Sequence, residues 1–145
     1  MEEQILAALA QFNLFYRELD EIYHQYAARQ GIGDAALWLL YSLCESPEPM
    51  TQRQLCAEWH SPPQTVNSAL KRLEQQGCIA LEPVPGNRKS KLVVLTETGR
   101  ELTRRVIEPV MLAERRALSA LTEEERAALT AVTRKYLDAL HRELG

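Results

Sequence analysis

The 145-residue sequence lacks most of the patterns on which enzyme and metal chemistry depend. Its three cysteines, Cys44, Cys56 and Cys78, contain no C-x-x-C pair, and its three histidines are scattered. We therefore expect buried thiols, no metal site and no cofactor. The chain also shows no nucleophile elbow, phosphate-binding loop or paired catalytic carboxylates, so we expect that it is not an enzyme.

Long apolar runs are also missing. No stretch approaches membrane-spanning length, and the N-terminal Met-Glu-Glu-Gln lacks the basic start of a signal peptide. Apolar residues make up 46% of the chain and charged residues 26%, as in ordinary soluble proteins. These features predict a cytoplasmic protein without a membrane partner, built as one domain or two closely joined halves.

Positive charge is scarce overall but concentrated in one segment. The net charge is −3, with residues 1–50 contributing −6, residues 51–91 contributing +3 and residues 92–145 contributing 0. A local excess of cations matters more for an anionic partner than the total charge does. The middle segment is therefore the candidate for nucleic-acid binding.

Helix signals fill the first half of that segment. Thr51 with Gln54 and Ser61 with Gln64 both fit the S/T-x-x-E/Q capping pattern, ten residues apart. Gly77 stands where a left-handed helix C-cap is expected. We therefore predict a helix of about two turns, a tight turn and a helix of about four turns.

The second of these helices has two faces. Helical spacing places an apolar set inward: Val66, Ala69, Leu70 and Leu73. The outward set carries amides and hydroxyls near its N-terminus and cations near its C-terminus: Gln64, Thr65, Asn67, Ser68, Lys71 and Arg72. Gln and Asn can pair with adenine edges, and Lys and Arg with guanine or phosphates.

A hairpin with a basic tip follows. Residues 78–81 and 91–95 are expected to be strands, and Pro85-Gly86 is a turn dipeptide. Cations cluster at or just after the tip, at Arg88, Lys89 and Lys91. A basic loop of this kind can enter a minor groove or hold a phosphate, although taken alone it would more often be a surface hairpin with solubilising charge.

Long amphipathic helices flank this centre. Residues 2 to about 29 carry a heptad-like apolar stripe widened to a second face, which suggests packing both on the hairpin domain and on a partner chain. Asp34 is the expected cap of a helix over 34–45. Thr96 or Thr98 should start a further helix that Pro109 bends, and Thr122 with Glu125 forms a capping box for the last helix.

In these residues the chain resembles the MarR family of transcriptional regulators. The similarity lies in 50–55, 64–67, 73–79 and 93–99, and the length and flanking helices fit as well. The expected fold class is mainly α with a small β-wing (α+β), a winged helix-turn-helix flanked by N- and C-terminal dimerisation helices. We expect residues 1–30 and 100–145 to form the dimerisation region and residues 34–98 the DNA-binding domain.

The wing departs from the family pattern at one place. The family often has Asp-x-Arg there, whereas this chain has Asn87-Arg88-Lys89. The Asp–Arg pair that stiffens the wing is therefore absent or replaced, and the sequence leaves open whether Arg88 or Lys89 enters the minor groove.

The resemblance implies a homodimeric, sequence-specific regulator, expected to be a repressor, on a pseudo-palindromic operator in double-stranded DNA. We place Gln64, Thr65, Asn67 and Ser68 near base edges and Arg88 at the minor groove. Phosphate contacts are assigned to Arg53, Lys71, Arg72, Lys89 and Lys91.

Relatives in the family often bind small phenolic or anionic ligands between the helical platform and the wing domain. The candidates here are Tyr16, Tyr23, Trp38, Tyr41 and Met111, with Arg17 or His24 as a polar anchor, although aromatic stripes are more often core than pocket.

Two alternative functions remain open. One is a winged protein-interaction module that does not read DNA, and the other is a thiol-responsive regulator.

Overall fold

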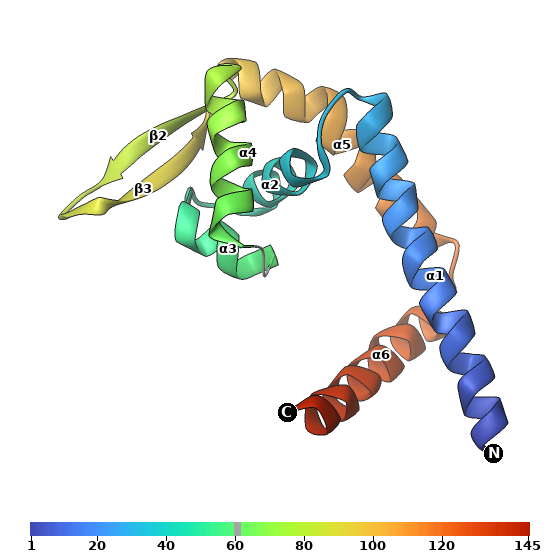
Figure 1. Ribbon diagram of the computed structural model, residues 1–145. Helices are drawn as coiled ribbons and strands as arrows, with labels where there is room; N and C mark the ends of the chain where they lie inside the picture. The colour runs from blue at the N-terminus through green and yellow to red at the C-terminus, as the bar shows by residue number, and fades with distance from the viewer. Residues whose placement is uncertain (60–61) are drawn as a thin grey trace. The chain divides into compact units, whose positions relative to one another are not determined.

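The chain is mainly helical. In the sequence, one short strand precedes the third helix, and two longer strands lie between the fourth and fifth helices. The computed structural model describes residues 1–59 and 62–145. It divides into two compact units, Met1–Ile107 and Glu108–Gly145. The elements in order are α1 (Glu2–Arg29), α2 (Asp34–Glu45), β1 (Met50–Thr51), α3 (Gln52–Trp59), α4 (Pro63–Gln75), β2 (Ile79–Val84), β3 (Asn87–Leu95), α5 (Glu97–Ser119) and α6 (Glu123–Leu144) (Figure 1). The expected mainly α fold with a small β-wing is confirmed.

The start of α3 is fixed by a local hydrogen-bond exchange. Thr51 Oγ1 accepts from the N–H of Gln54 at 3.1 Å, and Gln54 Oε1 accepts from the N–H of Thr51 at 2.8 Å. The predicted capping box is therefore confirmed. The cap predicted at Ser61 lies outside the described residues. Helix α4 begins at Pro63, where a missing N–H costs little because the first turn has no intrahelical partner for it.

The end of α4 depends on Gly77. This residue has φ +75°, the left-handed conformation that the sequence predicted. The N–H of Gly77 donates to the carbonyl of Glu74 at 2.9 Å, and the N–H of Cys78 donates to that of Leu73 at 2.9 Å. These two bonds form a Schellman motif, which satisfies the last carbonyls of the helix and turns the chain directly into β2.

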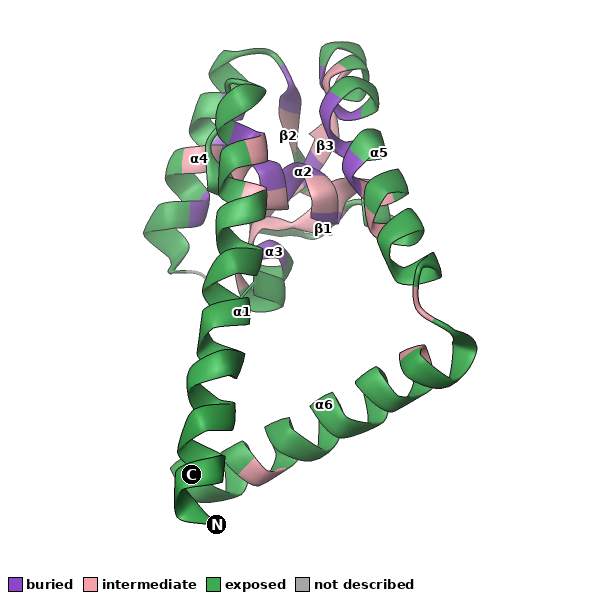
Figure 2. Cartoon of the chain, turned by 90° about the vertical axis from the view of Figure 1, so that its right-hand side faces the viewer, coloured by how far each residue is buried: buried purple, intermediate pink, exposed green. Residues whose placement is uncertain are grey.

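The core of the first unit forms around α2. Leu37, Leu39 and Leu40 are at most 3% exposed, and the expected inward residues Val66, Leu70 and Leu73 of α4 are also buried. The remaining core of this unit is supplied by α3, the start of the wing, β3 and the part of α5 up to Ile107: Leu55, Cys78, Ile79, Val93, Val106 and Ile107. Figure 2 shows these buried segments gathered where α2, α4, the strands and α5 meet.

The sheet is antiparallel, with strand order β1-β3-β2. Both wing strands are longer than predicted, because the turn at Pro85 and Gly86 pairs Val84 with Asn87 and so extends the hairpin past its apolar residues. Gly86 has φ +77°, which a two-residue turn needs and a side chain would disfavour. The hairpin projects away from the helices, as Figure 1 shows.

Helix α1 is packed only near its C-terminus. Ala27 is buried, and the hydroxyl of Tyr26 donates to the carbonyl of Val106 at 2.6 Å. The apolar side chains before Tyr23 are 41% to 61% exposed: Ile5, Leu6, Leu9, Phe12, Leu14, Phe15, Tyr16, Leu19 and Ile22. The helix ends at Arg29, close to the predicted end, and Gly31 beyond it has φ +74°. No helix in the described ranges is long and apolar enough to cross a membrane.

The prediction that Asp34 caps α2 is wrong. Gly33 occupies the N-cap position, and the helix start has no side-chain cap. The Asp34 carboxylate instead accepts a hydrogen bond from His24 Nδ1 at 2.9 Å. Asp34 is the first residue of the helix, one position after the N-cap, and its carboxylate is bound to His24 of α1.

Helix α5 begins at Glu97, directly after Thr96, one of the two expected starts. Thr96 Oγ1 accepts from the N–H of Gly99 at 3.0 Å, and the helix continues through Pro109. The second unit holds the end of α5 and all of α6. The predicted capping box is confirmed, since Thr122 Oγ1 accepts from the N–H of Glu125 at 3.1 Å and the Glu125 carboxylate accepts from the N–H of Thr122 at 2.9 Å. Helix α6, all of which the structure describes, buries no residue.

Candidate nucleic-acid interface

The outer face of α4 is open along its length. All six polar residues expected on it are exposed, and the apolar residues expected on the opposite face are buried, except Ala69, which is half-buried: Gln64, Thr65, Asn67, Ser68, Lys71 and Arg72 are outside, and Val66, Leu70 and Leu73 are inside. Gln75 is also exposed and continues the line of Ser68 and Lys71 at helical spacing, a position that the sequence interpretation did not include.

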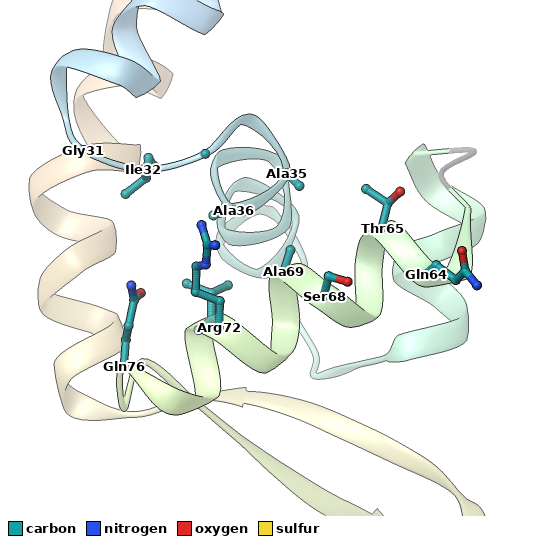
Figure 3. Close-up of a pocket in the computed structure, with 12 residues that line it drawn as sticks. Gly31, Ile32, Ala35, Ala36, Gln64, Thr65, Ser68, Ala69, Arg72 and Gln76 are labelled. Carbon is teal, nitrogen blue, oxygen red and sulfur yellow. The ribbon is translucent and has the colours of Figure 1, made fainter.

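One edge of this face borders a groove of about 500 Å³. From α4, its polar lining includes Gln64, Thr65, Ser68 and Arg72, and residues 31–33, 35 and 36 line it from the α1–α2 junction (Figure 3). On the opposite edge of α4, the amide nitrogen of Gln52 approaches Asn67 Oδ1 at 3.5 Å. Three of the four predicted base-reading residues, Gln64, Thr65 and Ser68, therefore line the same groove, whereas Asn67 lies toward Gln52 of α3.

A second groove, of about 300 Å³, lies between the start of α3 and the wing. It brings together three predicted phosphate ligands, Arg53 from α3 and Lys89 and Lys91 from β3. Among the described residues that line it, every charged side chain is a cation, and the neutral ones are Thr51, Gln52, Asn87 and Ser90. Such a groove suits a phosphate group, because cations from two elements face the same space.

Arg88 differs from its neighbours. It is exposed on β3, and the described lining of the groove holds Lys89 and Lys91 but not Arg88. Asn87, which the sequence interpretation did not assign to the site, also lines this groove. Its side-chain amide accepts a hydrogen bond from the N–H of Lys89 at 3.0 Å and donates one to Ser90 Oγ at 3.1 Å. The stiffening pair of the family pattern is thus replaced by an amide that bonds along its own strand.

Two of the candidate ligand-binding aromatics come together. Tyr23 and Trp38 line a cavity of about 520 Å³, with ring centroids 4.7 Å apart. The ring centroid of Tyr41 lies 5.5 Å from that of Trp38, but Tyr41 is not among the described residues that line this cavity. Tyr16 is 60% exposed and lies outside that lining, and Met111 belongs to the second unit. Both expected polar anchors, Arg17 and His24, line the cavity, together with Asp20, Glu21 and Asp34.

The titratable groups of this region are coupled. The hydrogen bond and charge of Asp34 raise the pKa of His24 above its ordinary value, and the charge of Glu21 adds to this effect.

Within the part of the chain that the structure describes, His, Cys, Asp and Glu side chains form no group of three or more that could hold a metal ion. Cys78 is buried, and burial raises the pKa of its thiol, which disfavours the reactive thiolate form.

Comparison with known proteins agrees with this geometry. Residues 30–90 match the model of the MarR family. The HTH-type transcriptional regulator PecS of Dickeya dadantii is 43% identical over 61 residues, which cover 42% of this chain and 37% of PecS, so the match spans well under half of that relative.

Solved structures extend the similarity along the chain. A MarR family regulator from Neisseria meningitidis is 20% identical with a TM-score of 0.78, and 94% of this chain and 96% of that chain are covered. AbsC from Streptomyces coelicolor is 20% identical with a TM-score of 0.80, covering 94% and 93%. S. aureus MepR, solved as a complex with DNA, is 22% identical with a TM-score of 0.73, covering 90% and 96%. Residues 30–90 are thus similar to the MarR family, and the chain as a whole has the winged-helix fold of the MarR-family structures that it matches.

Proposed function

We propose that this protein is a transcriptional regulator that binds double-stranded DNA. The observation that carries the proposal is the pairing of an exposed polar and basic α4 face with a cationic groove between α3 and the wing. Both lie in the only segment of an acidic chain with a net positive charge. The structure of MepR with DNA supports the same use of this fold. Residues of α4 read base edges, and Arg53, Lys89 and Lys91 hold phosphates.

The proposed assembly is a homodimer. Helix α1 exposes nine large apolar side chains before Tyr23, and α6 exposes a second set at 37% to 81%: Leu129, Val132, Tyr136, Leu137, Leu140 and Leu144. Apolar stripes of this length normally meet a partner. We assign residues 1–30 and 100–145 to the dimer platform and residues 34–98 to DNA binding, so that two α4 helices meet a pseudo-palindromic operator. Binding at such a site in a promoter represses transcription by occluding it.

An effector would fit the cavity at Tyr23 and Trp38. Its carboxylates, Asp20, Glu21 and Asp34, outnumber the cations, Arg17 and protonated His24. This balance favours a neutral aromatic ligand stacked on Trp38 over the anionic ligand that the sequence also suggested. Release from DNA requires that such a ligand bind the DNA-incompetent state more tightly.

The test of the proposed function is a DNA-binding titration. A pool of random duplexes is selected on the purified protein, and the affinity for the selected site and for its scrambled version is measured by fluorescence anisotropy at several salt concentrations. We expect tighter binding to the selected site and a negative slope of log affinity against log salt. Binding that is absent, or unaffected by salt, would instead support a protein-interaction module with a winged fold.

A further inference from the structure

Pairing within the wing is irregular at one point. Along β2, Pro83 pairs with Lys91 but the next residue, Val84, pairs with Asn87. Three residues of β3, Arg88 to Ser90, therefore lie between two successive pairs. Proline has no N–H to donate to a neighbouring strand, so the ladder is weakest where this irregularity occurs. The backbone of Arg88 to Ser90, which carries two of the three wing cations, must be held by something other than regular pairing.

Asn87 supplies that support. Its Oδ1 accepts from the N–H of Lys89 at 3.0 Å, and its Nδ2 donates to Ser90 Oγ at 3.1 Å. The amide spans the irregular segment with both of its polar ends. Asn is suited to this role because its short side chain hydrogen-bonds to backbone groups two residues further along the chain.

The segment held in this way forms one wall of the cationic groove. Asn87 itself, Lys89, Ser90 and Lys91 line the groove from β3, and Arg53 lines it from the first turn of α3. Lysine is a compact charge on a flexible stem, so its contribution at a phosphate depends on where the backbone places it. Loss of the Asn87 bonds would leave the charges in the chain but remove their convergence with Arg53.

We infer that Asn87 is a positioning residue for DNA binding, which fixes the β3 irregularity so that Lys89 and Lys91 converge with Arg53 on one phosphodiester segment. The inference rests on the proposed function and deepens it. Asn87 acts through the backbone of Lys89 and the hydroxyl of Ser90, and its substitution changes the number of phosphates engaged without changing the charge of the protein.

The experiment measures the salt dependence of binding to a fluorescein-labelled random-sequence duplex, because phosphate contacts do not depend on sequence. For Asn87→Ala we expect the slope of log affinity against log salt to become shallower by about two, as two cations stop neutralising fixed phosphates. Asn87→Ser retains an oxygen that can accept from the N–H of Lys89, so part of the slope should return. The melting temperature should match that of the unmodified protein, since the wing tip is exposed.

A double-mutant cycle separates positioning from a general structural role. The double variant Lys89→Ala, Lys91→Ala should itself have a shallower slope of log affinity against log salt. Adding Asn87→Ala to this double variant should not change the slope further. If the unmodified protein shows no salt-dependent binding, the proposed function falls and this inference with it. Two results would overturn only this inference, provided that the unmodified protein binds DNA. In the first, Asn87→Ala has the same salt slope as the unmodified protein. In the second, Asn87→Ala makes the slope shallower by the same amount in the protein that already lacks Lys89 and Lys91.

Discussion

His24 Nδ1 lies 2.9 Å from Oδ2 of Asp34, so a side chain near the end of α1 is bound to the first residue of α2. Both side chains are more than half exposed, at 59% and 54%. The pair bridges the Gly31 break between the helix assigned to assembly and the domain assigned to DNA.

The first prediction concerns the titration of this pair. Asp34 raises the pKa of His24 above 6.5 in the folded protein, so the pair stabilises the fold fully below the pKa of the unfolded chain. This contribution is lost as the pH rises through the higher pKa of the folded protein. NMR titration of the imidazole should give a raised pKa that Asp34→Asn lowers strongly and Glu21→Gln lowers only slightly. An equal effect of the two variants would contradict the assigned cause.

The second prediction separates base reading from phosphate binding on α4. Gln64→Ala should reduce the preference for the selected site over its scrambled version, by about 1–3 kcal/mol if Gln64 makes a bidentate base contact. Lys71→Ala should weaken binding to both duplexes alike and reduce the salt slope by about one. Anisotropy titrations of both variants on both duplexes measure these effects. A loss of preference in Lys71→Ala with none in Gln64→Ala would reverse the assignment.

The third prediction concerns the wing tip. Arg88 lies outside the described lining of the cationic groove, which leaves it available for the minor groove. Arg88→Ala should therefore lower affinity for the selected site and for scrambled DNA, with the larger loss where the duplex is rich in A·T pairs and its minor groove is narrow. Affinity that does not change on either duplex would remove Arg88 from the interface.

The fourth prediction addresses assembly. Leu19 is 49% exposed on α1, and Leu19→Asp places a charge within the apolar stripe. Sedimentation equilibrium should show a dimer for the unmodified protein and a monomer or a much weaker dimer for the variant. Gln11→Asp adds the same charge at an exposed polar position of the same helix and serves as the control. A dimer of unchanged affinity in Leu19→Asp would place the interface elsewhere.

The fifth prediction tests the packing of α5 on the end of α4. A Cβ atom at Gly99 would lie 1.9 Å from the carbonyl oxygen of Cys78, so the backbone would have to move. We expect Gly99→Ala to lower the free energy of unfolding by about 1–3 kcal/mol or more, measured by urea denaturation. Gly33→Ala, where a Cβ meets nothing within 4 Å, should change it by less than about 1 kcal/mol. Similar losses in both variants would show that the close approach is not the cause.

The features that the sequence predicted well are those decided within a few residues. The capping boxes at Thr51 and Thr122 and the left-handed Gly77 depend on bonds that span three to five positions, which the residue types already specify. The buried and exposed faces of α4 also follow from helical spacing alone. These local rules were enough to identify the winged helix-turn-helix and most of the candidate interface.

The features that the sequence did not predict depend on contacts between distant residues. Asp34 has the chemistry of a helix cap, but His24, ten positions away, binds it instead. The length of the wing followed from the pairing of Val84 with Asn87, where no apolar alternation marks a strand. The role proposed for Asn87 depends on the pairing register of β2 with β3, which leaves Arg88 to Ser90 without regular partners on β2.

The joint between α4 and α5 has a mechanical consequence. The carbonyl of Cys78 accepts from the N–H of Thr96 at 3.1 Å, and the Thr96 hydroxyl donates to the carbonyl of Gly77 while accepting from the N–H of Gly99. These hydrogen bonds join the end of α4 directly to the start of α5. In the proposed dimer, a change in the direction of α5 would therefore be passed to the C-terminal end of α4 and would change the angle at which α4 meets DNA.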